Sequence, residues 1–160
     1  MRPEYDYLVH LVRCTIHNLQ PRELPEGLDF AIIYEFSKFH HVANIAFQSI
    51  ERLSHKPEDL LYAKWKASYD KAIVRSINQN FATEEIRAVF QNLGIQWIEV
   101  QGTKIKPFYP QPQWRTMSDI DFIVKSGDLQ RAARALESLG YQWKFAHEGL
   151  EVAAHRPPNI

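Results

Sequence analysis

The sequence predicts an α+β protein in which an N-terminal helical region packs on a small mixed β-sheet. Through residue 93, apolar residues recur every three or four positions, which is the spacing of amphipathic helices. After Gly94 the pattern changes to short β-prone runs around one amphipathic helix. We therefore expect a helical region over residues 1–93 and an α/β core over residues 94–160, joined in one compact unit.

Two helical segments are predicted before residue 54. The first carries an apolar stripe from Tyr7 to Leu19 and ends in a segment that contains two prolines. The second covers residues 28–53, with apolar residues at helical spacing along its length. We expect it to break near His40 and His41, where the apolar pattern is interrupted.

A third helical pattern begins at Pro57, where acidic residues follow the proline as is typical of a first helical turn. Its apolar stripe continues to Gly94. At about 1.5 Å per residue an unbroken helix of this length would span roughly 55 Å. That is long for a compact domain of this size, so we expect either a bend near residues 78–83 or a helix that projects past the core.

The part of the chain after Gly94 shows strand and helix patterns in alternation. The apolar helix over residues 128–139 is stopped by Gly140, a residue that favours helix ends. The predicted order is strand, helix, strand, helix, strand, strand, over residues 95–100, 102–109, 119–124, 128–139, 141–145 and 150–154.

The composition is that of an ordinary globular protein. Hydrophobic residues make up 45% of the chain and charged residues 24%, which excludes extensive disorder. Lys plus Arg and Asp plus Glu number 19 each, so no net charge draws the chain to nucleic acid or to an anionic membrane. The single cysteine, Cys14, has no partner for an intrachain disulfide, and no apolar run approaches the length of a membrane span. We expect a cytoplasmic protein.

Two aspartates at the start of a predicted strand are the strongest chemical feature. Asp119 and Asp121 are two positions apart, so on a strand both carboxylates point to one face, about 6.5–7 Å apart at their α-carbons. Two such charges repel by roughly 3 kcal/mol at an effective dielectric constant near 20. The pair therefore favours a hard cation such as Mg²⁺. The alternative is a solvated polar edge with no ligand.

A second candidate group lies upstream of the aspartates. Gly102 and Thr103 follow a predicted strand and open a short helix, where backbone N–H groups and a hydroxyl could face a phosphate. Lys104, Lys106 and Arg115 add positive charge nearby. An ordinary helix cap would explain the Gly-Thr pair alone, but a strand, this turn, an arginine and a second strand with two aspartates together are much less easily explained as structural features.

The stretch VQGTKIKPFYPQPQWRTMSDIDFIVKSGDLQRAARALESLGY, residues 100–141, resembles the core of the uncharacterised nucleotidyltransferase family within the polymerase-β-like superfamily. The resemblance continues upstream, through His41 with Val42 and through Leu93 to Ile95, and so covers most of the chain. The matching positions in the core are Gly102, Thr103, Tyr109, Pro110, Arg115, Asp119, Ile120, Asp121, Gly140 and Tyr141.

The resemblance implies an enzyme that transfers a nucleoside monophosphate from a nucleoside triphosphate to an unidentified acceptor. In such enzymes the two aspartates hold two Mg²⁺ ions, which would make Asp119 and Asp121 the catalytic metal ligands. Gly102 and Thr103 would hold the β- and γ-phosphates, with Lys104 beside them. Arg115 would stabilise charge or brace its loop.

Three departures from the family pattern motivate an alternative function. Gln101 stands where the family usually has lysine, and Pro107 falls inside the short helix, where it would kink or shorten it. The third carboxylate of the superfamily is expected just beyond Ile160, so the chain is expected to be a C-terminally short member, with Glu151 as the candidate third acid. The alternative is an inactive remnant of the fold that serves as a binding or regulatory module.

Other residues favour structural roles. The seven histidines show no HxxxH or HExxH spacing, which argues against a histidine metal site. Trp114 is expected to pack in the core, with contact to a nucleobase as its alternative role. A truncated sheet would leave an unpaired strand edge, so we also expect a homodimer formed through that edge.

Overall fold

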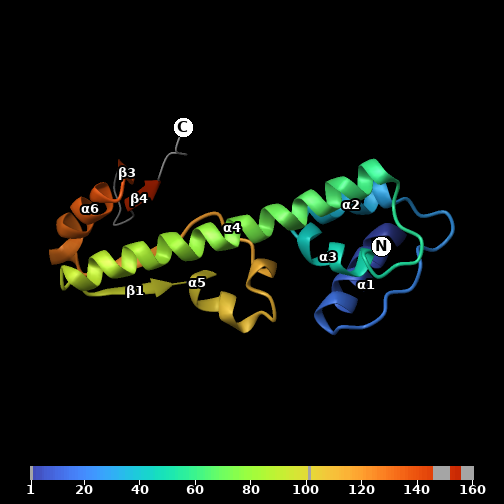
Figure 1. Cartoon of the computed structure of the whole chain (residues 1–160), viewed down its shortest axis with the longest axis horizontal. Coiled ribbons are helices and arrows are strands. Elements are labelled where there is room, and N and C mark those ends of the chain that lie inside the picture. The colour runs from blue at the N-terminus through green and yellow to red at the C-terminus, as the bar shows by residue number, and fades with distance from the viewer. Residues whose placement is uncertain (1, 101, 146–151, 156–160) are drawn as a thin grey trace. The chain divides into compact units, whose positions relative to one another are not determined.

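The computed structural model describes residues 2–100, 102–145 and 152–155 (Figure 1). Its helices and strands confirm the predicted α+β class. In chain order the elements are α1 (Pro3–Ile16), α2 (Phe30–Phe39), α3 (Ala43–Ile50), α4 (Asp59–Asn92), β1 (Trp97–Val100), α5 (Gly102–Ile105), β2 (Asp121–Val124), α6 (Leu129–Ser138), β3 (Gln142–Phe145) and β4 (Val152–His155).

The chain divides into two compact units where the sequence predicts one. The helical unit comprises Met1–Ile77 and Ile105–Met117, and the sheet unit comprises Asn78–Lys104 and Ser118–Ile160. The sequence predicts a division at residue 93 because the helical spacing of apolar residues ends there. The last turns of α4 nevertheless cluster with the sheet unit, because Ile86 and Phe90 are buried in the same apolar cluster as residues of α6.

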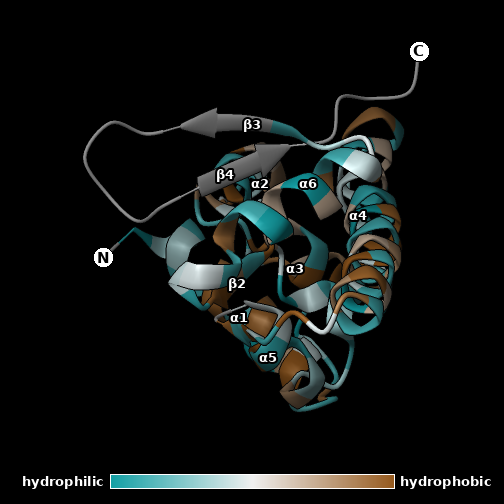
Figure 2. Ribbon diagram, turned by 90° about the vertical axis from the view of Figure 1, so that its left-hand side faces the viewer, coloured by the Kyte–Doolittle hydropathy of each residue, from teal (hydrophilic) through white to brown (hydrophobic). Residues whose placement is uncertain are grey.

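Apolar side chains from α1, α2, α3 and the first half of α4 form the core of the helical unit. Each helix carries both hydrophobic and hydrophilic residues along its ribbon, as amphipathic helices do (Figure 2). Hydrogen bonds cross this core: the Thr15 hydroxyl donates to the Ile45 carbonyl at 2.9 Å, and the Ser49 hydroxyl donates to the Leu11 carbonyl at 2.7 Å. The largest fully buried side chains here are Tyr7, Leu11, Ile33, Phe47, Ile50 and Trp65.

The predicted break near His40 and His41 is confirmed. Helix α2 ends at Phe39 and α3 begins at Ala43. Between them His41 adopts a φ of 56°, in the left-handed region, and the Val42 N–H donates to the Ser37 carbonyl at 2.9 Å. This turn lets two helices with separate apolar faces fold back on the same core.

Helix α4 is continuous from Asp59 to Asn92 and includes residues 78–83, where the sequence predicts a bend or else a helix that projects past the core (Figure 1). Thr83, a residue that competes with helical hydrogen bonding, donates its hydroxyl to the Gln79 carbonyl at 2.8 Å and stays within the helix. The helix ends at Asn92, just before Gly94, where the sequence predicts its end; Gly94 has a φ of 63°. Among the described residues, α4 included, no helix has both the length and the hydropathy needed to cross a bilayer.

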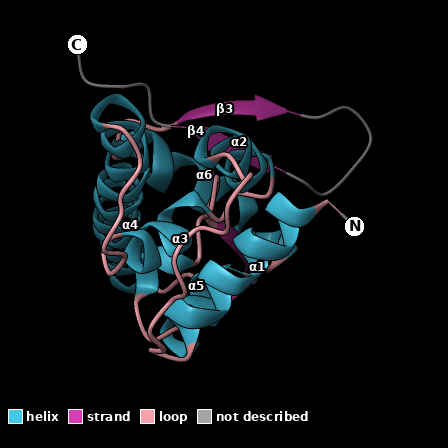
Figure 3. Cartoon of the chain, turned by 90° about the vertical axis from the view of Figure 1, so that its right-hand side faces the viewer, coloured by secondary structure: helices cyan, strands magenta, loops and turns pink. Residues whose placement is uncertain are grey.

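The described strands form two antiparallel pairs, β1 with β2 and β3 with β4, and not the single mixed sheet that the sequence predicts. Figure 3 shows β3 beside β4. A parallel pair needs a crossover connection of a dozen or more residues, and only residues 146–151 connect β3 to β4. Each described strand has one strand neighbour among the described residues. The homodimer through a sheet edge stays a prediction.

The imidazole of His10 makes the helical unit sensitive to acid. Its Nε2 accepts a hydrogen bond from the Arg22 backbone N–H at 3.1 Å, which requires that nitrogen to be unprotonated. Burial, and then the charges of Arg22 and Arg13, lower the pKa of His10 below its usual 6.5. The unfolded chain therefore binds this proton more readily than the folded chain.

We expect the free energy of unfolding to be highest above the unfolded-state pKa of His10 and to fall as the pH drops through about 6.5. Urea denaturation at closely spaced pH values between 7.5 and 5.5 would measure this decline. His10→Gln, which can accept the same hydrogen bond without titrating, should flatten it. Equal pH dependence in the two proteins would contradict the assignment.

Candidate functional site

The pairing of β1 with β2 brings the two predicted halves of the site together. Val100, the last residue of β1, lies opposite Asp121, the first residue of β2. Gly102 begins the helix that follows β1, so the Gly-Thr turn and the carboxylate of Asp121 are placed at the same end of this strand pair. Residues far apart in the sequence thus meet within the sheet unit.

The register also fixes which side chains share a face. Opposed residues of an antiparallel pair point to the same side, and neighbours along a strand point to opposite sides. Asp121 and Val100 therefore share one face with Ile98 and Ile123, which are 62% and 58% exposed. This open face is where a ligand of Asp121 would have to approach.

The opposite face of the strand pair is covered. The rings of Trp97 and Phe122 contact the ring of Phe90 in α4 edge-on, with centroids 5.9 and 6.0 Å from that of Phe90. The centroids of Trp97 and Phe122 are 5.5 Å apart. Glu99 lies on this face too, because it pairs with Phe122. The sheet unit thus has one packed face and one face that carries Asp121.

Asp119 lies before the strand, which corrects the predicted strand over residues 119–124. Strand β2 begins at Asp121, which pairs with Val100, the last described residue of β1, and the described pairs of the two strands include neither Asp119 nor Ile120. The Ser118 hydroxyl donates to Oδ1 of Asp119 at 2.9 Å. Asp119 is exposed and Asp121 is partly exposed, so solvent reaches both residues.

The Gly-Thr turn is short and is tied to β1. Helix α5 covers only Gly102–Ile105 and continues as a 3₁₀ turn over Lys106–Phe108, which confirms that Pro107 shortens the α-helix. The Thr103 hydroxyl donates to the Val100 carbonyl at 3.4 Å, a long hydrogen bond. In this state the hydroxyl is directed at its own strand.

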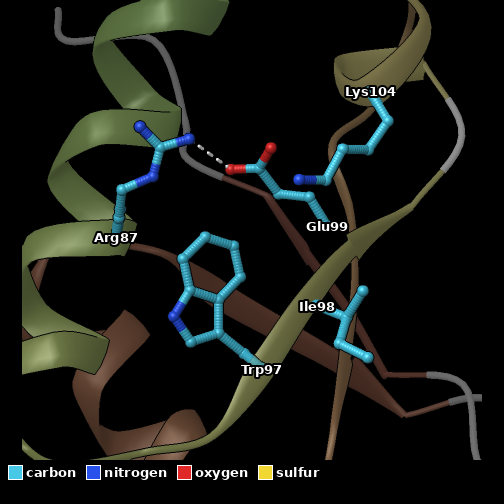
Figure 4. Close-up of a pocket in the computed structure, with 5 residues that line it drawn as sticks. All are labelled: Arg87, Trp97, Ile98, Glu99 and Lys104. Atoms are coloured by element: carbon cyan, nitrogen blue, oxygen red, sulfur yellow. Dashed lines mark hydrogen bonds and ion pairs between the residues drawn. The ribbon is translucent and has the colours of Figure 1, made fainter.

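Lys104 lines a pocket of about 480 Å³ together with Arg87, Trp97, Ile98 and Glu99 (Figure 4). A guanidinium nitrogen of Arg87 lies 2.7 Å from a carboxylate oxygen of Glu99, and this hydrogen bond raises the pKa of Arg87. The Lys104 amine extends towards the Glu99 side chain in Figure 4. The predicted phosphate contact of Lys104 stays a prediction.

The two other cations proposed from the sequence belong to the helical unit. Lys106 is only 5% exposed, and burial lowers its pKa. Arg115 donates to the Thr116 carbonyl at 3.1 Å, a contact of the kind expected if it braces its own loop. Trp114 is 6% exposed, in keeping with a packing role. A contact between Arg115 and phosphate remains a prediction.

Amide side chains attach the segment between the two halves of the site to α3. Nδ2 of Asn44 donates to the Gln113 carbonyl at 2.7 Å, and Nε2 of Gln48 donates to Oε1 of Gln111 at 2.6 Å. Nε2 of Gln113 donates to the same Gln111 oxygen at 2.8 Å. These bonds hold the segment within the helical unit.

The candidate third acid, Glu151, lies outside the described residues, as does Gln101. Glu99 is the buried acid closest in sequence to the Gly-Thr turn, but it points to the face opposite Asp121 and cannot complete the aspartate pair. Within the described part of the chain, no three His, Cys, Asp or Glu side chains are grouped closely enough to hold a metal ion.

Sequence reasoning missed Glu99 and its partner Arg87. In the run IQWIEV, a glutamate on a short strand looks like an ordinary solvent-facing residue of an alternating pattern. One signal was available: once the residues around Glu99 are assigned to the core, no polar surface is left for its carboxylate. Its partner lies twelve residues upstream on a helix, a separation that no local rule connects.

The family model described as "Uncharacterised nucleotidyltransferase" matches residues 26–158, which include both halves of the candidate site. No curated protein and no solved structure shows a significant match to the chain.

Asn44→Ala should destabilise the protein by roughly 1 kcal/mol, because Asn44 is 3% exposed and the variant removes its hydrogen bond to the Gln113 carbonyl. Urea denaturation would measure the change. Asn78→Ala, on the predominantly exposed stretch of α4, offers a matched asparagine control and should change the free energy of unfolding by less than about 0.5 kcal/mol. Equal effects of the two variants would contradict the anchoring role.

Proposed function

Because the chain belongs to the uncharacterised nucleotidyltransferase family, we propose that it transfers a nucleoside monophosphate from a nucleoside triphosphate to the hydroxyl of an acceptor, with Mg²⁺ as its cofactor. A general nucleotidyltransferase role follows from the family. The metal, the site residues and the acceptor class belong to the proposal.

One observation carries the proposal: Val100 of β1 is paired with Asp121 of β2. This register sets the Gly102–Thr103 turn beside the start of the aspartate strand. A phosphate held at the turn and a cation held by the aspartates would then be neighbours, as nucleotidyl transfer requires.

The two aspartates fit a magnesium ion. Mg²⁺ takes oxygen ligands and is usually bound through one or two carboxylates together with substrate phosphates and water. Asp119 and Asp121 supply such carboxylates on residues that solvent reaches, and the Asp119 carboxylate is oriented by the Ser118 hydroxyl. When bound, Mg²⁺ would neutralise charge on the phosphates and lower the pKa of the attacking hydroxyl.

The remaining residues would bind and orient the substrate. Gly102 would allow the triphosphate to approach the backbone, and Thr103 would turn its hydroxyl from the Val100 carbonyl to a phosphate oxygen. Lys104, which is exposed, would add a positive charge beside the turn. The exposed side chains of Ile98 and Ile123 exclude water from part of the open face once substrate covers them.

The competing function is that of an inactive remnant that binds a partner or regulates one. It is favoured by Gln101 and Pro107, which depart from the family pattern, and by the shortened helix α5. It predicts that nucleotide, if bound at all, is not turned over. The two functions therefore differ in pyrophosphate release.

We expect the wild-type protein to bind at least one nucleoside triphosphate in the presence of Mg²⁺ and to release pyrophosphate when a suitable acceptor is supplied. Asp119→Asn and Asp121→Asn should each lower turnover by about 100-fold or more, because bound metal supplies several kcal/mol of transition-state stabilisation. Isothermal titration calorimetry and a coupled pyrophosphate assay would measure the two properties.

Asp128→Asn is the matched control, since Asp128 pairs with Arg131 at the start of α6 and has no proposed role at the site. It should leave binding and turnover unchanged. Failure of the wild type to bind any nucleotide, or equal binding by the Asp119 and Asp121 variants, would overturn the proposal. Nucleotide binding without pyrophosphate release from any acceptor would favour the remnant.

A further inference from the structure

An ion pair connects α4 to β1 just before the Gly-Thr turn. The side chain of Glu99 is 6% exposed, and its Oε1 accepts from Arg87 at 2.7 Å (Figure 4). Arg87 also contacts Glu84 through its other terminal nitrogen, but Glu84 is 65% exposed. The Arg87 side chain is 43% exposed, so loss of Arg87 would leave the buried carboxylate of Glu99 without its partner, whereas loss of the exposed Glu84 should have little effect. Glu99 is therefore the partner that matters.

The residue after Glu99 joins the two halves of the proposed site. Val100 is paired with Asp121 across the strands, and its carbonyl accepts the hydroxyl of Thr103. A displacement of Val100 would therefore move the aspartate strand and the phosphate turn together. The ion pair between Glu99 and Arg87 connects this end of β1 to α4.

We propose that Glu99, held by Arg87, is a positioning residue that fixes the end of β1 and thereby sets the Gly102–Thr103 turn against Asp121. This inference rests on the proposed function for its catalytic meaning. Glu99 acts through the strand and not on the substrate, because it points to the packed face, away from Asp121.

The positioning role predicts a local effect with a defined pattern. Loss of the ion pair should loosen the Gly102–Lys104 segment and the start of β2 together, because both depend on Val100. Helix α6, which packs in the same unit through Ala132 and Leu136, should stay protected. A purely structural ion pair would instead lower stability throughout the unit.

NMR order parameters of the backbone amides test this pattern without requiring activity, and amide hydrogen exchange in α6 reports the stability of the unit. In Glu99→Gln and Arg87→Met, the order parameters should fall from about 0.85 to about 0.6 or lower at residues 102–104 and 121–122, with exchange in α6 little changed. Arg87→Lys, which retains a charge for Glu99, should restore most of the order. Glu84→Gln removes the exposed partner of the same arginine and should match the wild type.

Should Arg87→Met fail to fold, Glu99→Gln and Arg87→Lys decide the matter. Unchanged order parameters at residues 102–104 and 121–122 in Glu99→Gln would overturn the proposal. A fall at only one of the two segments, or much faster exchange in α6, would also overturn it.

Binding of Mg²⁺ with each nucleoside triphosphate provides the second measurement. If the wild type binds, the folded Glu99→Gln protein should bind roughly 10- to 100-fold more weakly, the loss typical of residues that orient metal ligands, and Glu84→Gln should bind normally. Wild-type affinity in Glu99→Gln would count against positioning. If the wild type binds no nucleotide, the proposed function fails, and the order parameters alone decide whether Glu99 couples the two segments.

Discussion

The antiparallel pairing of β1 with β2 is the constraint on which the candidate site depends. Each strand has only four residues, so the pair has little hydrogen bonding of its own to hold its register. Side chains hold it: Trp97 and Phe122 pack with Phe90 on the covered face, and a slip of β2 by one residue would turn Phe122 to the open face. The same slip would turn Asp121 away from the open face. Core packing thus sets the position of the aspartate.

The chain between the two halves of the site leaves the sheet unit and returns to it. Residues 105–117 cluster with the helical unit, where amides of α3 bind Gln111 and Gln113 and where Trp114 is buried. Anchoring such a segment reduces the conformations available to it.

The sequence was most informative where local chemistry determines structure. Helical periodicity predicted α1, the break at His41 and the end of α4 at Gly94, because spacing and left-handed backbone positions are local properties. The continuity of α4 through residues 78–83 was not predictable, since it depends on which side chains each half of the helix buries. The start of β2 was missed by two residues for a similar reason: the bounds of a strand depend on its pairing with a distant partner, here Asp121 with Val100.

The candidate site likewise contains residues that the local sequence identifies and a residue whose role depends on distant parts of the chain. The aspartates and the Gly-Thr turn can be read from the sequence because their residue types carry the chemistry. Glu99 could not be found in this way, because its importance comes from burial and from Arg87 on another element. Glu99 contacts none of the predicted ligands. It is nevertheless the charged residue next to Val100, where the two halves of the site join. Substitutions that alter nucleotide binding are therefore expected on the packed face of the strand pair as well as on its open face.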